Sequence, residues 1–118
     1  MSSAKVAVGL VRDLFFRSKI DAVASALGAT VAYASSLDAA ALRCAKLKPD
    51  LIFADLSDAT FPALETIEKI RAVAPDARVV GFASHIDLKP LRAAREAGFD
   101  LTLSRSEFTA QLPDLLKP

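Results

Sequence analysis

The stretch Pro49-Asp-Leu-Ile-Phe-Ala-Asp55 contains four consecutive apolar residues that are followed directly by an acid. An apolar run without polar alternation is typical of a strand that is covered on both faces in a parallel sheet. Such a strand presents Asp55 at its carboxyl end, and open α/β sheets bind their ligands at that edge. Asp55 is therefore the first candidate functional residue of the chain.

Five short apolar segments alternate with helical patterns along the sequence. The predicted strands are residues 5–10, 30–34, 50–54, 78–82 and 101–104. Asp13 is predicted to cap a first helix, which Gly28 ends. Ser36 is predicted to cap a second helix, which ends near residue 47, and a third lies between Thr60 and Pro75. A fourth runs from Asp87 to Gly98. A short fifth helix begins at Ser106, and Pro113 interrupts or shortens it.

Apolar residues at helical spacing mark the sides of these helices that are predicted to face the core. They are Phe16, Ile20, Val23 and Leu27 in the first helix, Leu64, Ile67 and Ile70 in the third, and Leu88, Leu91, Ala94 and Ala97 in the fourth. Because neighbouring helical residues cannot both point inward, Phe15 is expected near the crevice or on an exposed face.

Five strands that alternate with five helices predict a (βα)5 chain, folded as a single domain over residues 1–118. Right-handed crossovers make it a flavodoxin-like three-layer α/β sandwich, whose five-stranded parallel sheet has the order 2-1-3-4-5. The topological switch point then lies between the first and third strands. The loops after Leu10, Ala54 and Phe82 are expected to meet there, in one crevice around Asp55.

The composition argues against several classes of function. The chain has 15 basic and 14 acidic residues and so lacks the positive charge of a nucleic-acid-binding protein. No apolar run approaches the roughly 18 residues that a membrane helix needs, and the N-terminus lacks the pattern of a signal peptide. The single Cys44 cannot form an internal disulfide. We expect Cys44 to be an unreactive thiol that packs, with Leu42, on the buried side of a helix. A single thiol of this kind is typical of a cytoplasmic protein.

These segments resemble the receiver domains of response regulators, of the chemotaxis-regulator type, over essentially the whole chain. The resemblance rests on Lys5-Val-Ala-Val, on the strand that ends with Asp55, on Val79-Val-Gly-Phe-Ala-Ser-His85, and on the tract Ala93-Ala-Arg-Glu-Ala-Gly-Phe-Asp100. In that family an Asp accepts a phosphoryl group, an acidic pair holds Mg²⁺, and a hydroxyl and a Lys bind the phosphoryl oxygens. The resemblance places the acceptor on Asp55.

The other functional positions of that family are changed in this sequence. The resemblance places the acidic pair on Leu10 and Val11, which have no oxygen to bind a hard cation. It places the hydroxyl on Ala83, although the neighbouring Ser84 could supply one, and the Lys on Arg105, which keeps the positive charge and can bind an anion with two N–H groups. It places the family's switch aromatic on Thr102. We therefore predict no metal, no cofactor and no catalytic residue.

The sequence favours a divergent, stand-alone receiver-like domain that is not an enzyme. We expect it to act through contact with a signalling protein or a second copy of itself, without Mg²⁺-dependent phosphorylation. A working phospho-acceptor receiver remains an alternative, with Asp13 or a carbonyl completing a metal site. Another is a small enzyme or binding protein for an anionic ligand, with a site at Arg12, Asp55, His85 and Arg105.

Less specific interpretations of the same residues also stay open. Asp55 can accept hydrogen bonds from loop amides or pair with Arg12 or Arg105. Ser84, His85 and Asp87 have the residue types of a hydrolase triad, but adjacent positions seldom converge on one point. We interpret Asp87 as a helix cap and His85 as a loop residue at the mouth of the crevice. The supporting or anion-binding candidates are Arg12, Asp13, Ser84, His85 and Arg105.

Overall fold

The computed structural model of the chain describes residues 4–84 and 88–118, in which five strands alternate with five helices. The strands are β1 (Val6–Leu10), β2 (Thr30–Tyr33), β3 (Leu51–Asp55), β4 (Arg78–Ala83) and β5 (Leu101–Ser104). The helices are α1 (Leu14–Leu27), α2 (Leu37–Leu47), α3 (Ala63–Val73), α4 (Leu88–Ala97) and α5 (Arg105–Leu116). The strands form one parallel sheet in the order β2-β1-β3-β4-β5, so the predicted flavodoxin-like topology is confirmed.

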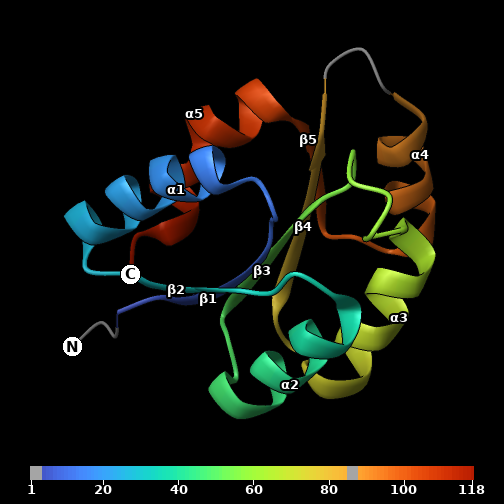
Figure 1. Ribbon diagram of the computed structural model, residues 1–118, viewed down its shortest axis with the longest axis horizontal. Coiled ribbons are helices and arrows are strands. Elements are labelled where there is room, and N and C mark those ends of the chain that lie inside the picture. Colours follow the sequence, from blue (N-terminus) through green and yellow to red (C-terminus); the bar gives the residue numbers. More distant parts are fainter. Residues whose placement is uncertain (1–3, 85–87) are drawn as a thin grey trace.

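The helices cover both faces of the sheet. Figure 1 shows α1 and α5 on one face and α2, α3 and α4 on the other. One core cluster, which includes Phe16, Phe53 and Phe108, lies under α1 and α5. A second, which includes Cys44 and Ile70, lies under α2, α3 and α4. The three predicted layers are therefore present, with a separate hydrophobic core on each side of the sheet.

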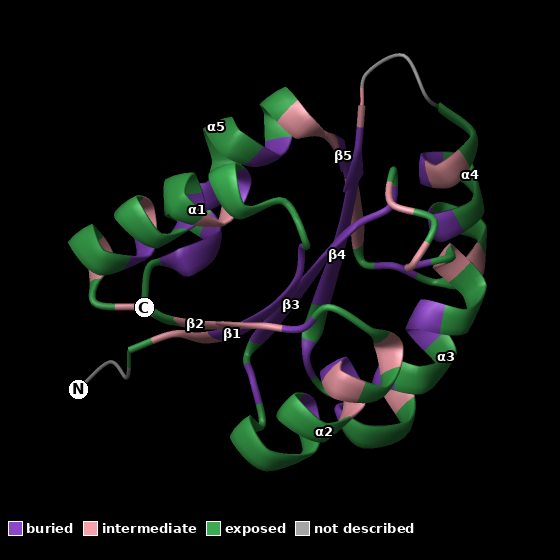
Figure 2. Cartoon of the chain, viewed as in Figure 1, coloured by how far each residue is buried: buried purple, intermediate pink, exposed green. Residues whose placement is uncertain are grey.

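The central strand β3 is buried along its whole length, as Figure 2 shows for the middle of the sheet. It pairs with β1 on one side and with β4 on the other, and Asp55 stands opposite Phe82 in the register with β4. The strand extends one residue beyond the predicted end. Asp55 is thus the last residue of the strand, at the carboxyl edge and the topological switch point of the sheet.

The ends of α1 and α2 have the predicted capping groups. The Asp13 carboxylate accepts a hydrogen bond from the Phe16 backbone N–H, and the Ser36 hydroxyl accepts one from the Ala39 N–H. Gly28 ends α1 with a φ of 70°, a left-handed conformation that glycine adopts without steric cost. Asp87, predicted to open α4, lies outside the described residues.

Helix α5 differs from its prediction at both ends. It begins at Arg105, one residue before Ser106, because Ser104 and Glu107 form a capping box. Pro113 does not interrupt it, and the helix continues to Leu116. The second half of α5 packs against the sheet through three buried side chains, Leu112, Leu115 and Leu116. This tertiary packing outweighs the tendency of proline to break a helix.

Two residues predicted to face the core are exposed instead. Leu64 is 58% exposed and Leu88 is 61% exposed. Both lie in the first turn of their helices, next to the loops, where the apolar stripe extends past the core. Leu42 is exposed as well, although it was predicted to pack beside Cys44, because Ala40 and Cys44 form the buried side of α2. No helix among the described residues is both long and apolar enough to span a membrane.

Candidate functional site

Three chain segments bring ionisable side chains together at the carboxyl edge of the sheet. Asp55 ends β3, Asp13 caps the start of α1, and Arg105 is the first residue of α5. The parallel topology places all three segments at the same edge, although they are far apart in the sequence (Figure 1). At this edge, Arg105 therefore lies between the carboxylates of Asp13 and Asp55.

Asp55 is 6% exposed, and both of its carboxylate oxygens have protein partners. Oδ1 accepts a hydrogen bond from the Ser57 backbone N–H at 3.1 Å, and Oδ2 accepts one from Arg105 Nη2 at 3.2 Å. Burial raises the pKa of Asp55 above its ordinary value. The Arg105 charge and the Ser57 hydrogen bond oppose this shift, and the nearby Asp58 and Asp13 add to it.

Arg105 connects β3, α1 and α5. Besides its contact with Asp55, its Nη1 lies 3.5 Å from Asp13 Oδ2. The guanidinium also lies over the Phe16 ring, 4.6 Å from its centroid, and 5.8 Å from the centroid of Phe82. Cation–π contacts of this kind favour a guanidinium that is partly removed from water. The predicted positive charge at this position is thus held by ionic and aromatic contacts together.

Asp13, the nearest acid after β1, acts as a helix cap. The Phe16 N–H donates to its Oδ1 at 3.2 Å, and this hydrogen bond lowers the pKa of the exposed Asp13 carboxyl. Its other oxygen faces Arg105. The two positions at the end of β1, Leu10 and Val11, are completely buried in the apolar core.

Arg12 is directed away from Asp55. Its Nη1 donates to Thr60 Oγ1 at 2.8 Å and lies 3.4 Å from Asp58 Oδ1, so it joins the β1–α1 loop to the β3–α3 loop. Asp58 also accepts from the Thr60 N–H at 2.9 Å. Partial burial opposes the ionisation of Asp58, but these hydrogen bonds outweigh it and lower its pKa. Of the two arginines predicted near Asp55, only Arg105 contacts it.

The loops after β3 and β4 are joined by a serine pair. The Ser84 backbone N–H donates to Ser57 Oγ at 2.9 Å. Ser84 also lines a groove of about 350 Å³ between α1 and α5, to which Arg105 contributes. His85 lies outside the described residues, so its predicted place at the mouth of the crevice has no structural description. In residues 4–84 and 88–118, no three His, Cys, Asp or Glu side chains are grouped as metal ligands.

Several residues of this edge were missed from the sequence. Asp58 and Thr60 form a local turn in which an Asp side chain accepts the N–H two residues later, and the Asp-x-Thr pattern could have indicated it. Lys19 lines the α1–α5 groove one helical turn after Phe16. Its spacing could have placed it beside Phe16, but nothing in the sequence indicated that α5 lies opposite.

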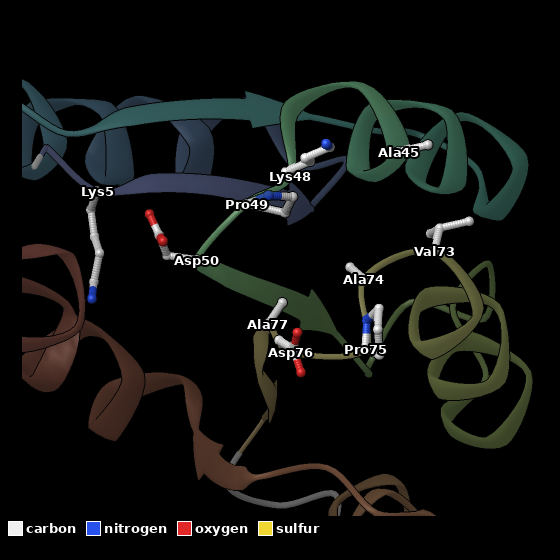
Figure 3. A pocket seen from close by; sticks show the side chains of 10 residues that line it. All are labelled: Lys5, Ala45, Lys48, Pro49, Asp50, Val73, Ala74, Pro75, Asp76 and Ala77. Carbon is white, nitrogen blue, oxygen red and sulfur yellow. The ribbon is translucent and has the colours of Figure 1, made fainter.

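A wider groove of about 560 Å³ lies at the opposite edge of the sheet, between the ends of α2 and α3. Its charged side chains are Lys5, Lys48, Asp50 and Asp76. Figure 3 shows that their charged ends point in different directions and do not meet at one point. This groove therefore lacks the convergent polar groups that a binding site needs.

Comparison with solved structures identifies the architecture. The receiver domain of the sensor histidine kinase PA1611 from Pseudomonas aeruginosa PAO1, which has a magnesium ion in its active-site cleft, superimposes with a TM-score of 0.80 and 16% identity, over 97% of this chain and 95% of that one. A signal receiver domain from Bermanella marisrubri gives a TM-score of 0.81 and 22% identity, over 96% and 95% of the two chains. No protein-family model and no curated protein matches the sequence.

NtrX from Brucella abortus gives a TM-score of 0.80 at 18% identity, and the match covers 96% of this chain but only 25% of NtrX. The class is therefore α/β, flavodoxin-like, with Asp55 at the topological switch point of the sheet. More specifically, the chain has the fold of response-regulator receiver domains. At sequence identities of 16–22%, these comparisons define the fold of the chain.

Proposed function

We propose that this chain is a divergent receiver-like signalling domain, not an enzyme, that works by contacting another signalling protein and without Mg²⁺-dependent phosphorylation. The observation that carries the proposal is the ion pair between Arg105 and the buried Asp55. Arg105 offsets the charge of this carboxylate from within the protein, while Leu10 and Val11, at the end of β1, are buried and offer no oxygen to a metal ion. We further propose that the domain acts in the cytoplasm, in keeping with its single, buried thiol.

The contacts of Asp55 argue against phosphoryl transfer to it. Transfer to a carboxylate requires a free oxygen that can approach phosphorus in line, and cations that offset the charge of the phosphoryl oxygens. Here one oxygen of Asp55 accepts from Arg105 and the other from the Ser57 N–H. Because Asp55 is also only 6% exposed, little of its carboxylate is open to an incoming phosphoryl group.

The residues around Asp55 also do not fit the magnesium ion that the receiver fold implies. Mg²⁺ requires oxygen ligands in nearly octahedral geometry. Leu10 and Val11 occupy the end of β1 and are buried, and Asp13 is occupied by the α1 N-terminus and Arg105. The last residue of β4, Ala83, is buried and has no hydroxyl. The proposed function therefore does not involve a metal ion.

An exposed apolar pair supports contact with a protein partner. Leu14 is 70% exposed and Phe15 is 86% exposed, and they form the first turn of α1, directly after the Asp13 cap. Two adjacent large apolar side chains beside a crevice have no packing role in the domain itself. Covering these two side chains with a partner protein would contribute favourable binding free energy, and aromatic residues are enriched at protein interfaces.

Phosphorylation is tested by incubating the whole chain with Mg²⁺ and acetyl phosphate and recording the intact mass, and with Mg²⁺ and beryllofluoride while recording NMR spectra. We expect no covalent adduct and no shift of the Asp55 region. A response regulator from Burkholderia pseudomallei, which was crystallised with a phosphorylated aspartic acid, serves as the positive control. An adduct on the wild-type chain that is absent from Asp55→Asn would overturn the proposal.

A reconstructed variant makes the same test sharper. Leu10→Asp, Val11→Asp, Ala83→Thr and Arg105→Lys together restore the family's charged and hydroxyl groups. We expect the adduct to form only in this combined variant, provided that its circular dichroism remains that of the folded chain. An Arg105→Lys single variant is the matched control and should remain unmodified.

A further inference from the structure

We propose that the groove between α1 and α5 binds a small organic phosphate monoester. This inference goes beyond the proposed contact with a protein and is independent of phosphorylation. It rests on a cavity that is lined by cationic, hydroxyl and aromatic side chains of α1, α5 and the residue that follows β4.

The groove has the size and location of a small-ligand site. Its volume of about 350 Å³ lies within the range of pockets that hold small molecules. Phe16 and Lys19 contribute from α1, and Ser84 from the end of β4. The first two turns of α5 contribute Arg105, Ser106 and Thr109. The groove thus lies at the same edge of the sheet as Asp55 but on the side covered by α1 and α5.

The two cations of the groove come from different helices, Lys19 from α1 and Arg105 from α5. The contacts of Arg105 with Asp55 and Asp13, at 3.2 and 3.5 Å, use only part of its N–H groups. Its side chain remains 38% exposed. An anion between Lys19 and Arg105 would therefore receive charge-assisted hydrogen bonds from both sides.

The remaining lining distinguishes a phosphate monoester from a simple anion. Ser84 and Ser106 carry hydroxyls that can donate, whereas the Thr109 hydroxyl donates to the Arg105 carbonyl at 3.0 Å. This number of donors suits a group with three acceptor oxygens better than a carboxylate. Phe16, over whose ring the Arg105 guanidinium lies, is the apolar residue of the lining and would contact the organic part of the ligand.

Phenyl phosphate and inorganic phosphate serve as the probes, titrated into the isotope-labelled full chain at constant ionic strength and followed by amide NMR. We expect saturable shifts at Lys19, Ser84 and Ser106 with a dissociation constant for phenyl phosphate of about 1 mM or lower, and weaker binding of inorganic phosphate. The absence of saturation, or shifts spread over all basic residues, would overturn the proposal.

Two variants and one control test the assigned contacts. Lys19→Gln should weaken phenyl phosphate binding about tenfold, whereas Lys46→Gln, an exposed lysine on α2, should leave it unchanged. Asp55→Asn should strengthen binding, because it removes a negative charge that competes for Arg105. Equal binding by the wild type and Lys19→Gln, or weaker binding by Asp55→Asn, would show that these residues do not form the site.

Discussion

The contact between Asp55 and Arg105 combines a buried acid with a cation that is held in place by aromatic rings. Burial disfavours the charged carboxylate, and the Arg105 charge only partly offsets this effect, so the pKa of Asp55 is raised. A buried ion pair of this kind contributes little net stability, because removing the two charges from water costs about as much as their attraction returns. Its importance lies in fixing the positions of α1, β3 and α5 relative to one another.

The raised pKa of Asp55 predicts how Asp55→Asn changes the dependence of stability on pH. Between the ordinary pKa, about 4, and the raised one, the folded chain binds more protons than the unfolded chain. The stability that protonated Asp55 contributes is therefore present below about pH 4 and is lost as the pH rises through the folded pKa. Asparagine does not titrate. The free energy of unfolding of the variant minus that of the wild type should thus be larger at pH 7 than at pH 4, as measured by urea unfolding.

Asp58→Asn provides the control with the opposite sign. The pKa of Asp58 is lowered, so its contribution to stability is present above the ordinary pKa and is lost as the pH falls. The same difference in unfolding free energy should therefore become more negative toward pH 7. Parallel pH curves for the two variants would contradict at least one of the two assignments.

Helix α5 shows how a local pair of hydrogen bonds sets the position of a functional side chain. The Glu107 N–H donates to Ser104 Oγ at 3.1 Å, and the Ser104 N–H donates to Glu107 Oε1 at 2.8 Å. This capping box starts the helix at Arg105. The guanidinium therefore extends from the first turn of the helix, where it reaches Asp55.

Ser104→Ala should lower the free energy of unfolding by about 1 kcal/mol, because it leaves the first turn of α5 without its capping acceptor. Ser106→Ala is the matched control and should have a much smaller effect, since Ser106 is exposed and caps no N–H group in the helix. Guanidinium unfolding measures both. A larger loss for Ser106→Ala than for Ser104→Ala would place the start of the helix where the sequence pattern predicted it.

The strand pattern and the position of Asp55 could be predicted because burial on both faces removes polar residues from a strand. The directions of Arg12 and Lys19 could not, because each depends on a partner from a distant segment, Asp58 or α5. The exposure of Leu64 was also missed. Helical spacing gives the side of a helix that faces the core, but it does not indicate where along its length the core ends.

On the scale of the whole domain, the three loops at the carboxyl edge are linked to one another. Arg12 joins the β1–α1 and β3–α3 loops, Ser84 and Ser57 join the β3–α3 and β4–α4 loops, and Arg105 joins β3 to α5. The strands beneath these loops are closely packed. Gly9 of β1 stands between Tyr33 of β2 and Phe53 of β3, and a Cβ at this position would approach Phe53 Cε2 to 2.6 Å.

Gly9→Ala should lower the free energy of unfolding by about 1–3 kcal/mol, the usual cost of overfilling a packed core. Phe53 cannot move easily, because it is completely buried and its ring lies 5.3 Å from that of Phe108. Phe53→Leu should relieve the overlap, so that the double variant is more stable than the sum of the two single changes predicts. Additive changes in urea unfolding would show that Gly9 and Phe53 are not in close contact.

Cys44 gives this chain a natural reporter of its own opening. It is the only cysteine, it is completely buried, and burial raises the pKa of its thiol to about 11. Because an exposed thiolate is the nucleophile that reacts with thiol reagents, Cys44 can be modified only in molecules that have transiently unfolded around α2. The labelling rate in native buffer therefore measures how often this side of the sheet becomes exposed to solvent, without any engineered probe.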